Sequence, residues 1–358
     1  MNTSTEMLSA LLGDKADAAL IISNSNRRYF TGFVSSLGYL LVTRKQAYLF
    51  VDFRYAEAAE KQADGCEVIC YKDLESDLSE ILVNENIKSV LLEGSAFTLN
   101  DAQKIDGILS KNNAQSIHSD ELDKLVSKLR IVKTSEEIEK IIHAQRITER
   151  ALSETLPLIK EGVMEKDIAL ELEYKMRKLG ADGVSFDLIV IAGEKTSMPH
   201  GVPGDNRIKP GDFITFDIGA LYEGYHSDMT RTYAYGCVND KQKRVYYTVL
   251  QAQKLALEAI GAGVKCADVD RAARDYIYHA GYEGYFGHST GHGVGLDIHE
   301  QPFVSSKSET VLQSGMVITA EPGIYLPGEF GVRIEDMAVV TSDGCINLAT
   351  ITKELIVL

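Results

Sequence analysis

The chain has 358 residues, a formal net charge of −15 and five cysteines. So acidic a protein is poorly suited to bind nucleic acid or an anionic membrane surface, and no apolar run approaches the roughly 18 residues that a membrane-spanning helix needs. The N-terminus has no secretory signal pattern, and the cysteines lie outside any CxxC pair, so we expect reduced thiols, a cytoplasmic location and about two domains.

The first 127 residues alternate strand-forming and helical segments. The runs AALIIS, YLLVT, AYLFVD and SVLLEG have the aliphatic content of strands, whereas LESDLSEILVNEN and NDAQKIDGILSKN space their apolar residues as helices do. This pattern predicts an α/β domain at 1–127. Thr134 and Glu137 then have capping-box spacing, which predicts that a long helix runs to about Leu158 near the start of a second domain, 128–358.

The second domain holds a faint internal repeat. EGVMEKDIA begins at 161 and AGVKCADVD at 262, LGADG at 179 and AGYEG at 280, and GDFITFDIG at 211 and GMVITAEPG at 315. Three matches in the same order at nearly one offset indicate a duplicated unit of two helices and a strand hairpin. A pseudo-twofold fold of this kind would place Asp217 and Glu321 facing one shared cleft.

The segment FDIGALYEGYHSDMTRTYAYG reads as two strands joined by a tight turn. If Tyr222 and Glu223 form a two-residue loop, Asp217 and Asp228 lie directly opposite each other on one face, about 5 Å apart at Cβ. Opposed like charges are destabilising. The pair therefore predicts either a bound cation or a raised pKa, and a divalent metal is the simpler expectation.

Further candidate site residues follow in a glycine-rich stretch, whose backbone we expect to be flexible, and in two later strand-like runs: His288, His292, His299, Glu321, Arg333 and Glu335. Four carboxylates and one imidazole form a mostly oxygen environment that is too acidic for a single structural zinc. Such a set suits two metal ions about 3.5–4 Å apart, a common hydrolytic device. Ligand type alone leaves Mn(II), Co(II), Fe(II) and Zn(II) open.

Seven motifs in this order carry a family resemblance: NRRYFTGF, VDFRY, MPHGVP, DIGALYEGYHSDMTRT, GHGVGLDIHE, EPGIY and GVRIED. They resemble the pita-bread metallopeptidases, specifically the Xaa-Pro branch of aminopeptidase P and the prolidases. The resemblance implies an α/β creatinase/prolidase-like N-terminal domain at 1–127 and an α+β pita-bread catalytic domain with a pseudo-twofold repeat at 128–358. It also implies hydrolysis of short proline-containing peptides and a homodimer.

The resemblance implies a role for each matching residue. The ligands of two divalent ions, with manganese expected first and Co, Zn or Fe as alternatives, would be Asp217, Asp228, His292, Glu321 and Glu335. Asp228 and Glu335 would bridge the two ions. Glu321 would also act in catalysis by passing a proton to the proline nitrogen.

The remaining implied roles concern the substrate. His200 would contact the region of the scissile amide, and His299 would stabilise the tetrahedral intermediate, so both would be catalytic and substrate-binding. His288 would line the same pocket. Arg333 would orient Glu335 and the wall of the cleft.

One position departs from the family pattern. Dipeptidases of this family often carry an arginine directly after HExP, where it can hold the carboxylate of a dipeptide, but here the run is HEQPF, with Phe303 in that place. We therefore favour a Xaa-Pro aminopeptidase over a strict Xaa-Pro dipeptidase. Less favoured alternatives are a methionine aminopeptidase-like enzyme, a creatinase-like amidinohydrolase and a non-catalytic binding protein of the same fold.

Overall fold

The computed structural model describes residues 4–358 and divides the chain after Arg130 into an N-terminal and a C-terminal unit. The expected boundary after residue 127 falls inside helix α6 (Glu121–Arg130). That helix belongs wholly to the N-terminal unit, because Leu122 and Leu125 pack in its core and the Arg130 side chain donates a hydrogen bond to Asn26. No helix within residues 4–358 combines the length and the apolar character needed to cross a bilayer.

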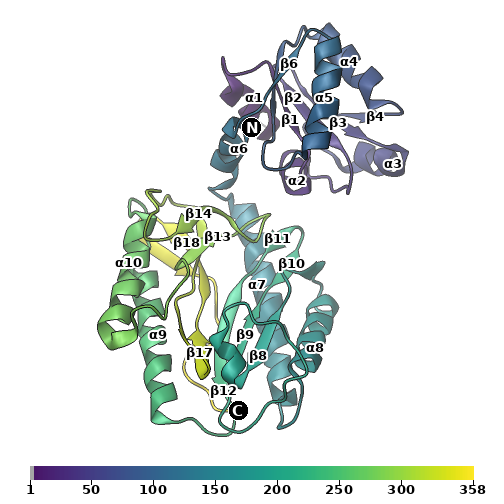
Figure 1. The fold of residues 1–358 in the computed structure, drawn as a ribbon. Coiled ribbons are helices and arrows are strands. Elements are labelled where there is room, and N and C mark those ends of the chain that lie inside the picture. The colour runs from purple at the N-terminus through teal and green to yellow at the C-terminus, as the bar shows by residue number, and fades with distance from the viewer. Residues whose placement is uncertain (1–3) are drawn as a thin grey trace. The chain divides into compact units, whose positions relative to one another are not determined.

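The N-terminal unit is a mixed sheet between helices, as its alternating pattern predicts (Figure 1). The strand order is β4-β3-β2-β1-β5-β6, with bounds β1 (Ala18–Ile21), β2 (Tyr39–Thr43), β3 (Ala47–Val51), β4 (Glu67–Cys70), β5 (Ser89–Leu92) and β6 (Gln115–Ile117). The other helices are α1 (Ser4–Leu12), α2 (Asn24–Thr31), α3 (Phe53–Gln62), α4 (Leu74–Asn84) and α5 (Leu99–Lys111). Successive strand residues face opposite sides, so Ile21 packs with α1 and α6 whereas Leu20 packs with α4 and α5.

The C-terminal unit consists of two halves with separate hydrophobic cores. The first half contains α7 (Ser135–Thr155), α8 (Glu165–Lys178), β7 (Gly183–Val184), β8 (Ile189–Ala192), β9 (Phe213–Ile218), β10 (Ala220–Tyr222), β11 (Tyr225–His226) and β12 (Met229–Ala234). The second contains α9 (Asp240–Ala259), α10 (Cys266–Ile277), β13 (Gly291–Gly293), β14 (Glu300–Val304), β15 (Val317–Ala320), β16 (Gly323–Leu326), β17 (Phe330–Arg333), β18 (Asp336–Thr341) and β19 (Gly344–Asn347). Short helical turns lie at Leu156–Leu158, Gly193–Ser197 and Tyr278–Tyr282.

Each half presents two helices on the outside and antiparallel strands toward the middle of the unit (Figure 1). This repeated order confirms the pseudo-twofold architecture expected from the sequence repeat. The long helix also begins as predicted: in the capping box of α7, the Thr134 side chain accepts from the Glu137 backbone and the Glu137 side chain accepts from the Thr134 backbone. Two otherwise unpaired backbone groups at the helix start are satisfied in this way.

The predicted register of the hairpin is wrong by two residues. The loop is Glu223-Gly224 rather than Tyr222-Glu223, and Asp217 pairs with Thr230. Both loop residues have positive φ, 45° and 78°, as a type I′ turn requires, and this turn matches the twist of the flanking strands. A shift of two preserves the face of each side chain, so Asp217 and Asp228 are diagonal neighbours on one face instead of direct opposites.

Candidate metal centre and active site

A cavity of about 560 Å³ lies in the C-terminal unit, and residues from both halves line it. All nine site residues predicted from the sequence are on its wall: His200, Asp217, Asp228, His288, His292, His299, Glu321, Arg333 and Glu335. Asp217, at the end of β9, and Glu321, directly after β15, face this one cavity, as the internal repeat predicts.

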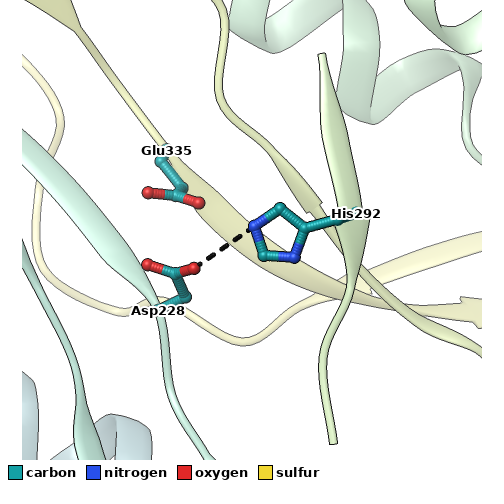
Figure 2. A group of neighbouring side chains, drawn as sticks. All are labelled: Asp228, His292 and Glu335. Atoms are coloured by element: carbon teal, nitrogen blue, oxygen red, sulfur yellow. Dashed lines mark ion pairs between the residues drawn. The ribbon is translucent and has the colours of Figure 1, made fainter. Parts of the chain in front are cut away.

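Three buried side chains form a close cluster of possible metal ligands. Asp228, His292 and Glu335 each offer a ligand atom, and these atoms lie within 4.8 Å of one another. Figure 2 shows the two carboxylates coming from different segments, Asp228 directly before β12 and Glu335 directly before β18, with the imidazole directed toward Asp228. The Nε2 atom of His292 is 3.5 Å from Oδ2 of Asp228 and 3.4 Å from Oε1 of Glu321, so a fourth ligand candidate adjoins the cluster.

The strand that carries His292 is closely packed rather than flexible, which corrects the expectation for this glycine-rich stretch. A Cβ on Gly291 would lie 2.0 Å from the Thr319 carbonyl oxygen, and one on Gly293 would lie 2.3 Å from that of Gln301. Nδ1 of His292 is 3.1 Å from the Gly293 carbonyl oxygen, an atom that can only accept. Nδ1 therefore carries the proton, and Nε2 presents its lone pair to the cluster.

Asp217 lines the same cavity as this cluster and is held by an arginine. Nη2 of Arg333 donates to Asp217 Oδ2 over 2.5 Å, and both side chains are largely buried. The second oxygen, Oδ1, is buried and has no hydrogen-bond partner among the described residues. Since a buried carboxylate oxygen is rarely left unpaired, this atom fits a position that a cation completes.

Burial and mutual repulsion raise the pKa of the clustered acids. The pKa of Asp228 lies well above its usual value because of burial and the nearby charges of Asp217 and Glu321. Glu335 shows the same direction of pKa shift, caused by burial and then by Asp228, and the pKa of Glu321 rises to about 8, mainly through burial. Divalent cations would remove this penalty, so the residues present fit a metal centre.

Two hydroxyl groups that the sequence reasoning missed organise the site. Thr230 Oγ1 donates to Glu335 Oε2 over 2.7 Å and accepts from Nε of Arg333 over 3.1 Å. The hydroxyl of Tyr325 is 2.9 Å from both Nη1 of Arg333, which donates to it, and Nε2 of His288, which accepts from it. The only signal for Thr230 was its spacing of two residues from Asp228, which places both on one face.

The three further histidines surround the acid cluster without joining it. The His299 ring centroid is 4.3 Å from that of His292, and His200 lines the cavity from the loop after Pro199, whose carbonyl oxygen accepts from Arg333. His288 is kept neutral, because burial and then Arg333 lower its pKa to about 4. Both ring nitrogens of His288 are engaged, by the Ser289 carbonyl oxygen and the Tyr325 hydroxyl, whereas His200 and His299 place further imidazoles on the cavity wall.

Phe303 lies on the cavity wall beside the candidate metal ligands. It pairs with His292 across strands β13 and β14, so the two side chains lie on the same face, and Phe303 lines the cavity while remaining 44% exposed. Arg333 is the only arginine or lysine of the described lining, and Asp217 and Tyr325 already engage it. This wall therefore offers no unengaged arginine or lysine to a free carboxylate.

Comparison with known proteins adds two family matches that together span nearly the whole chain. Residues 139–342 match the profile of metallopeptidase family M24, and residues 6–132 match that of the creatinase/prolidase N-terminal domain. The chain is 40% identical to the Xaa-Pro dipeptidase of Pyrococcus furiosus, over 95% of both proteins.

Two solved structures are similar along almost their full length. A Xaa-Pro dipeptidase from Bacillus anthracis has a TM-score of 0.94 at 41% identity and covers 99% of both chains. An X-Pro aminopeptidase from Thermotoga maritima has a TM-score of 0.89 at 38% identity, covering 96% of this chain and 98% of its own. The pita-bread fold with its creatinase-type N-terminal domain is thereby confirmed.

Proposed function

Because the chain belongs to metallopeptidase family M24, we propose that it is a dinuclear-metal exopeptidase that hydrolyses the Xaa-Pro bond of short peptides. One observation carries this proposal, namely that five potential ligands converge on a single cavity from both halves of the catalytic unit: Asp217, Asp228, His292, Glu321 and Glu335. A non-catalytic relative would be expected to lack part of this set. The names of similar proteins in two bacteria and an archaeon support the Xaa-Pro bond as the target.

These five residues would hold two divalent ions, with Asp228 and Glu335 shared between them. Bound metal would supply Lewis acidity and lower the pKa of a water molecule toward neutrality. The unpartnered oxygen of Asp217 and the raised pKa values of Asp228 and Glu335 support this assignment. Carboxylate and imidazole ligands suit manganese, which we propose first, and also suit Co, Zn and Fe.

The remaining residues of the cavity would act on the substrate. Glu321 would take the proton of the attacking water and deliver it to the leaving proline nitrogen, which has no hydrogen of its own in the peptide bond. His200 would contact the region of the scissile amide in the bound substrate, and His299 would donate a hydrogen bond to the carbonyl oxygen as negative charge develops there. Arg333 holds Asp217 in place, and through Tyr325 it is linked to His288 on the substrate side.

Two specificities remain candidates, each with an observation in its favour. Phe303 and the lack of an unengaged arginine or lysine among the described lining residues support an aminopeptidase that accepts longer peptides, because nothing clamps a dipeptide carboxylate. The relatives named Xaa-Pro dipeptidase support the dipeptidase. A homodimer in the cytoplasm is the expected setting for either enzyme.

Hydrolysis of Ala-Pro and of Ala-Pro-Ala-Ala by the Mn(II)-loaded protein tests this proposal. Chromatography of released alanine would report both activities in parallel. Release from the longer peptide alone would identify an aminopeptidase, and release from the dipeptide alone a prolidase. If neither peptide is cleaved by a protein that carries manganese, the Xaa-Pro proposal is wrong.

A further inference from the structure

The loop that carries His200 has little regular structure of its own. Between β8 and β9 the chain forms a short 3-10 turn, Gly193–Ser197, and then continues through residues 198–206 without a helix or strand. Four of these loop residues besides Pro199 line the cavity: His200, Gly201, Val202 and Pro203. An irregular segment needs side-chain anchors to hold catalytic geometry, since loops are otherwise mobile.

One buried carboxylate accepts hydrogen bonds from residues at both ends of this loop. Glu165 is the first residue of α8, and its side chain is 1% exposed. Its Oε1 accepts from the Ala192 backbone N–H over 2.8 Å and from the Asn206 side chain over 2.9 Å. Its Oε2 accepts from Nζ of Lys195 over 2.7 Å and from the Gly204 backbone N–H over 3.0 Å. All four acceptor positions of the carboxylate are thereby used.

Backbone contacts reinforce the same junction. The Glu165 N–H donates to the Asn206 carbonyl oxygen over 3.1 Å, so the start of α8 and the end of the loop are joined twice. On the far side, the loop is tied to the second half by the Thr196 hydroxyl, which accepts from Gly331 N–H, and by Pro199, which accepts from Arg333. The loop is therefore anchored by Glu165 on one side and by strand β17, which carries Gly331 and Arg333, on the other.

We infer that Glu165 is a positioning residue for the substrate side of the cavity, because it fixes both ends of the loop that presents His200. This inference rests on the proposed function. Glu165 does not line the cavity and is not among the ligand candidates, so its effect would reach the substrate only through the loop. Charge-assisted hydrogen bonds from Lys195 and from two backbone N–H groups make it a strong anchor.

Glu165→Gln in the Mn(II)-loaded full-length protein tests this role, with Glu149→Gln as the matched control. Glu149 is also buried and accepts from Arg146, from the hydroxyl and N–H of Thr350 and from the N–H of Ile351, but this C-terminal segment does not line the cavity. Both variants thus remove a carboxylate that binds several donors. Of the two carboxylates, only that of Glu165 binds the loop that carries His200.

Hydrogen exchange, steady-state kinetics and manganese content would be measured for each variant. In Glu165→Gln we expect amides of residues 193–206 to exchange at least about tenfold faster, and kcat/KM to fall about 10- to 100-fold through KM. Manganese content should equal that of the wild type. In Glu149→Gln the thermal midpoint should fall similarly, with kcat/KM within about twofold.

Three results would overturn the inference. The first is an unchanged rate of amide hydrogen exchange at residues 193–206 in Glu165→Gln. The second is an equal loss of kcat/KM in Glu165→Gln and Glu149→Gln. The third is full recovery of KM in Glu165→Gln with Lys195→Met, which would trace the defect to an unpaired lysine. If Glu165→Gln does not fold, Asn206→Ala removes one anchor only and must still loosen the loop. Hydrogen exchange stays informative even if the wild type cleaves no Xaa-Pro bond, so the two proposals can fail separately.

Discussion

Replacing Glu321 by glutamine is expected to stabilise the metal-free protein above neutral pH, although it removes a proposed metal ligand. The pKa of this carboxyl rises from 4.5 to about 8, mainly because burial disfavours the charged form, and Asp217 adds repulsion against the attraction of Arg333. A raised pKa means that the folded state binds the proton more tightly than the unfolded state does. The stability this contributes is complete below pH 4.5 and is lost as the pH rises through about 8.

The size of the effect follows from the shift. One pKa unit corresponds to about 1.4 kcal/mol, so the full shift amounts to about 5 kcal/mol. The Glu321 side chain retains 18% exposure, and solvent screens part of the penalty, so we expect about 2–3 kcal/mol between acidic and alkaline pH. Glutamine does not titrate, and the variant should keep this stability.

Urea unfolding of chelator-treated wild type and Glu321→Gln at about pH 5 and about pH 8 measures the difference. Far-ultraviolet circular dichroism is the suitable probe, since the chain contains no tryptophan. Glu258→Gln, an exposed substitution on α9, serves as the control and should follow the wild type. In manganese the order should reverse, because the variant binds metal less tightly. Parallel losses of stability in wild type and Glu321→Gln from acidic to alkaline pH would refute the reasoning.

Further substitutions probe the metal centre and the cavity wall. Asp228→Ala should abolish hydrolysis and lower the manganese content seen by atomic absorption, because one bridging carboxylate cannot hold two ions; full metal content with retained activity would contradict the bridging role. Phe303→Arg should raise the rate on Ala-Pro relative to Ala-Pro-Ala-Ala by at least about tenfold through a charge-assisted bond to the dipeptide carboxylate, whereas Phe303→Leu should leave the ratio unchanged. Tyr325→Phe should lower kcat/KM about tenfold at constant metal content, since His288 and Arg333 lose the hydroxyl they share; an unaltered kcat/KM would exclude that link. Chelation of the wild type should lower the thermal midpoint and Mn(II) should restore it, so a midpoint indifferent to metal would argue against the centre.

The sequence was sufficient to predict site residues that stand out by their own side-chain type. Acids in strand-forming runs are unfavourable without a reason, so Asp217 and Asp228 stand out in the sequence alone. The internal repeat then paired Asp217 with Glu321 across the fold. The faces of these residues were predicted correctly, because a side chain's face depends only on odd or even spacing along a strand.

The failures concern backbone conformation and hydrogen bonds between distant segments. The hairpin register depended on positive φ at Glu223, which a non-glycine residue rarely adopts, and nothing in the local pattern requires it. Thr230 donates to Glu335 across 105 positions of the chain, and the donors to Glu165 begin with Ala192 at the end of β8, 27 residues later. The Thr230 contact joins the two halves and the Glu165 contacts lie within the first half, but both depend on tertiary packing, so no spacing rule could identify them.

Gly291 and Gly293, which flank His292, limit the amino-acid substitutions that this protein can accept during evolution. Neither contributes a side chain to the reaction, yet at either position even a methyl group would collide with the carbonyl oxygen of a neighbouring strand. A saturation library should therefore show Gly291 and Gly293 to be as intolerant of replacement as His292, the proposed metal ligand between them. We expect all three positions to be retained together, the two glycines because a neighbouring strand occupies the place of any side chain, and His292 for the nitrogen atom it presents.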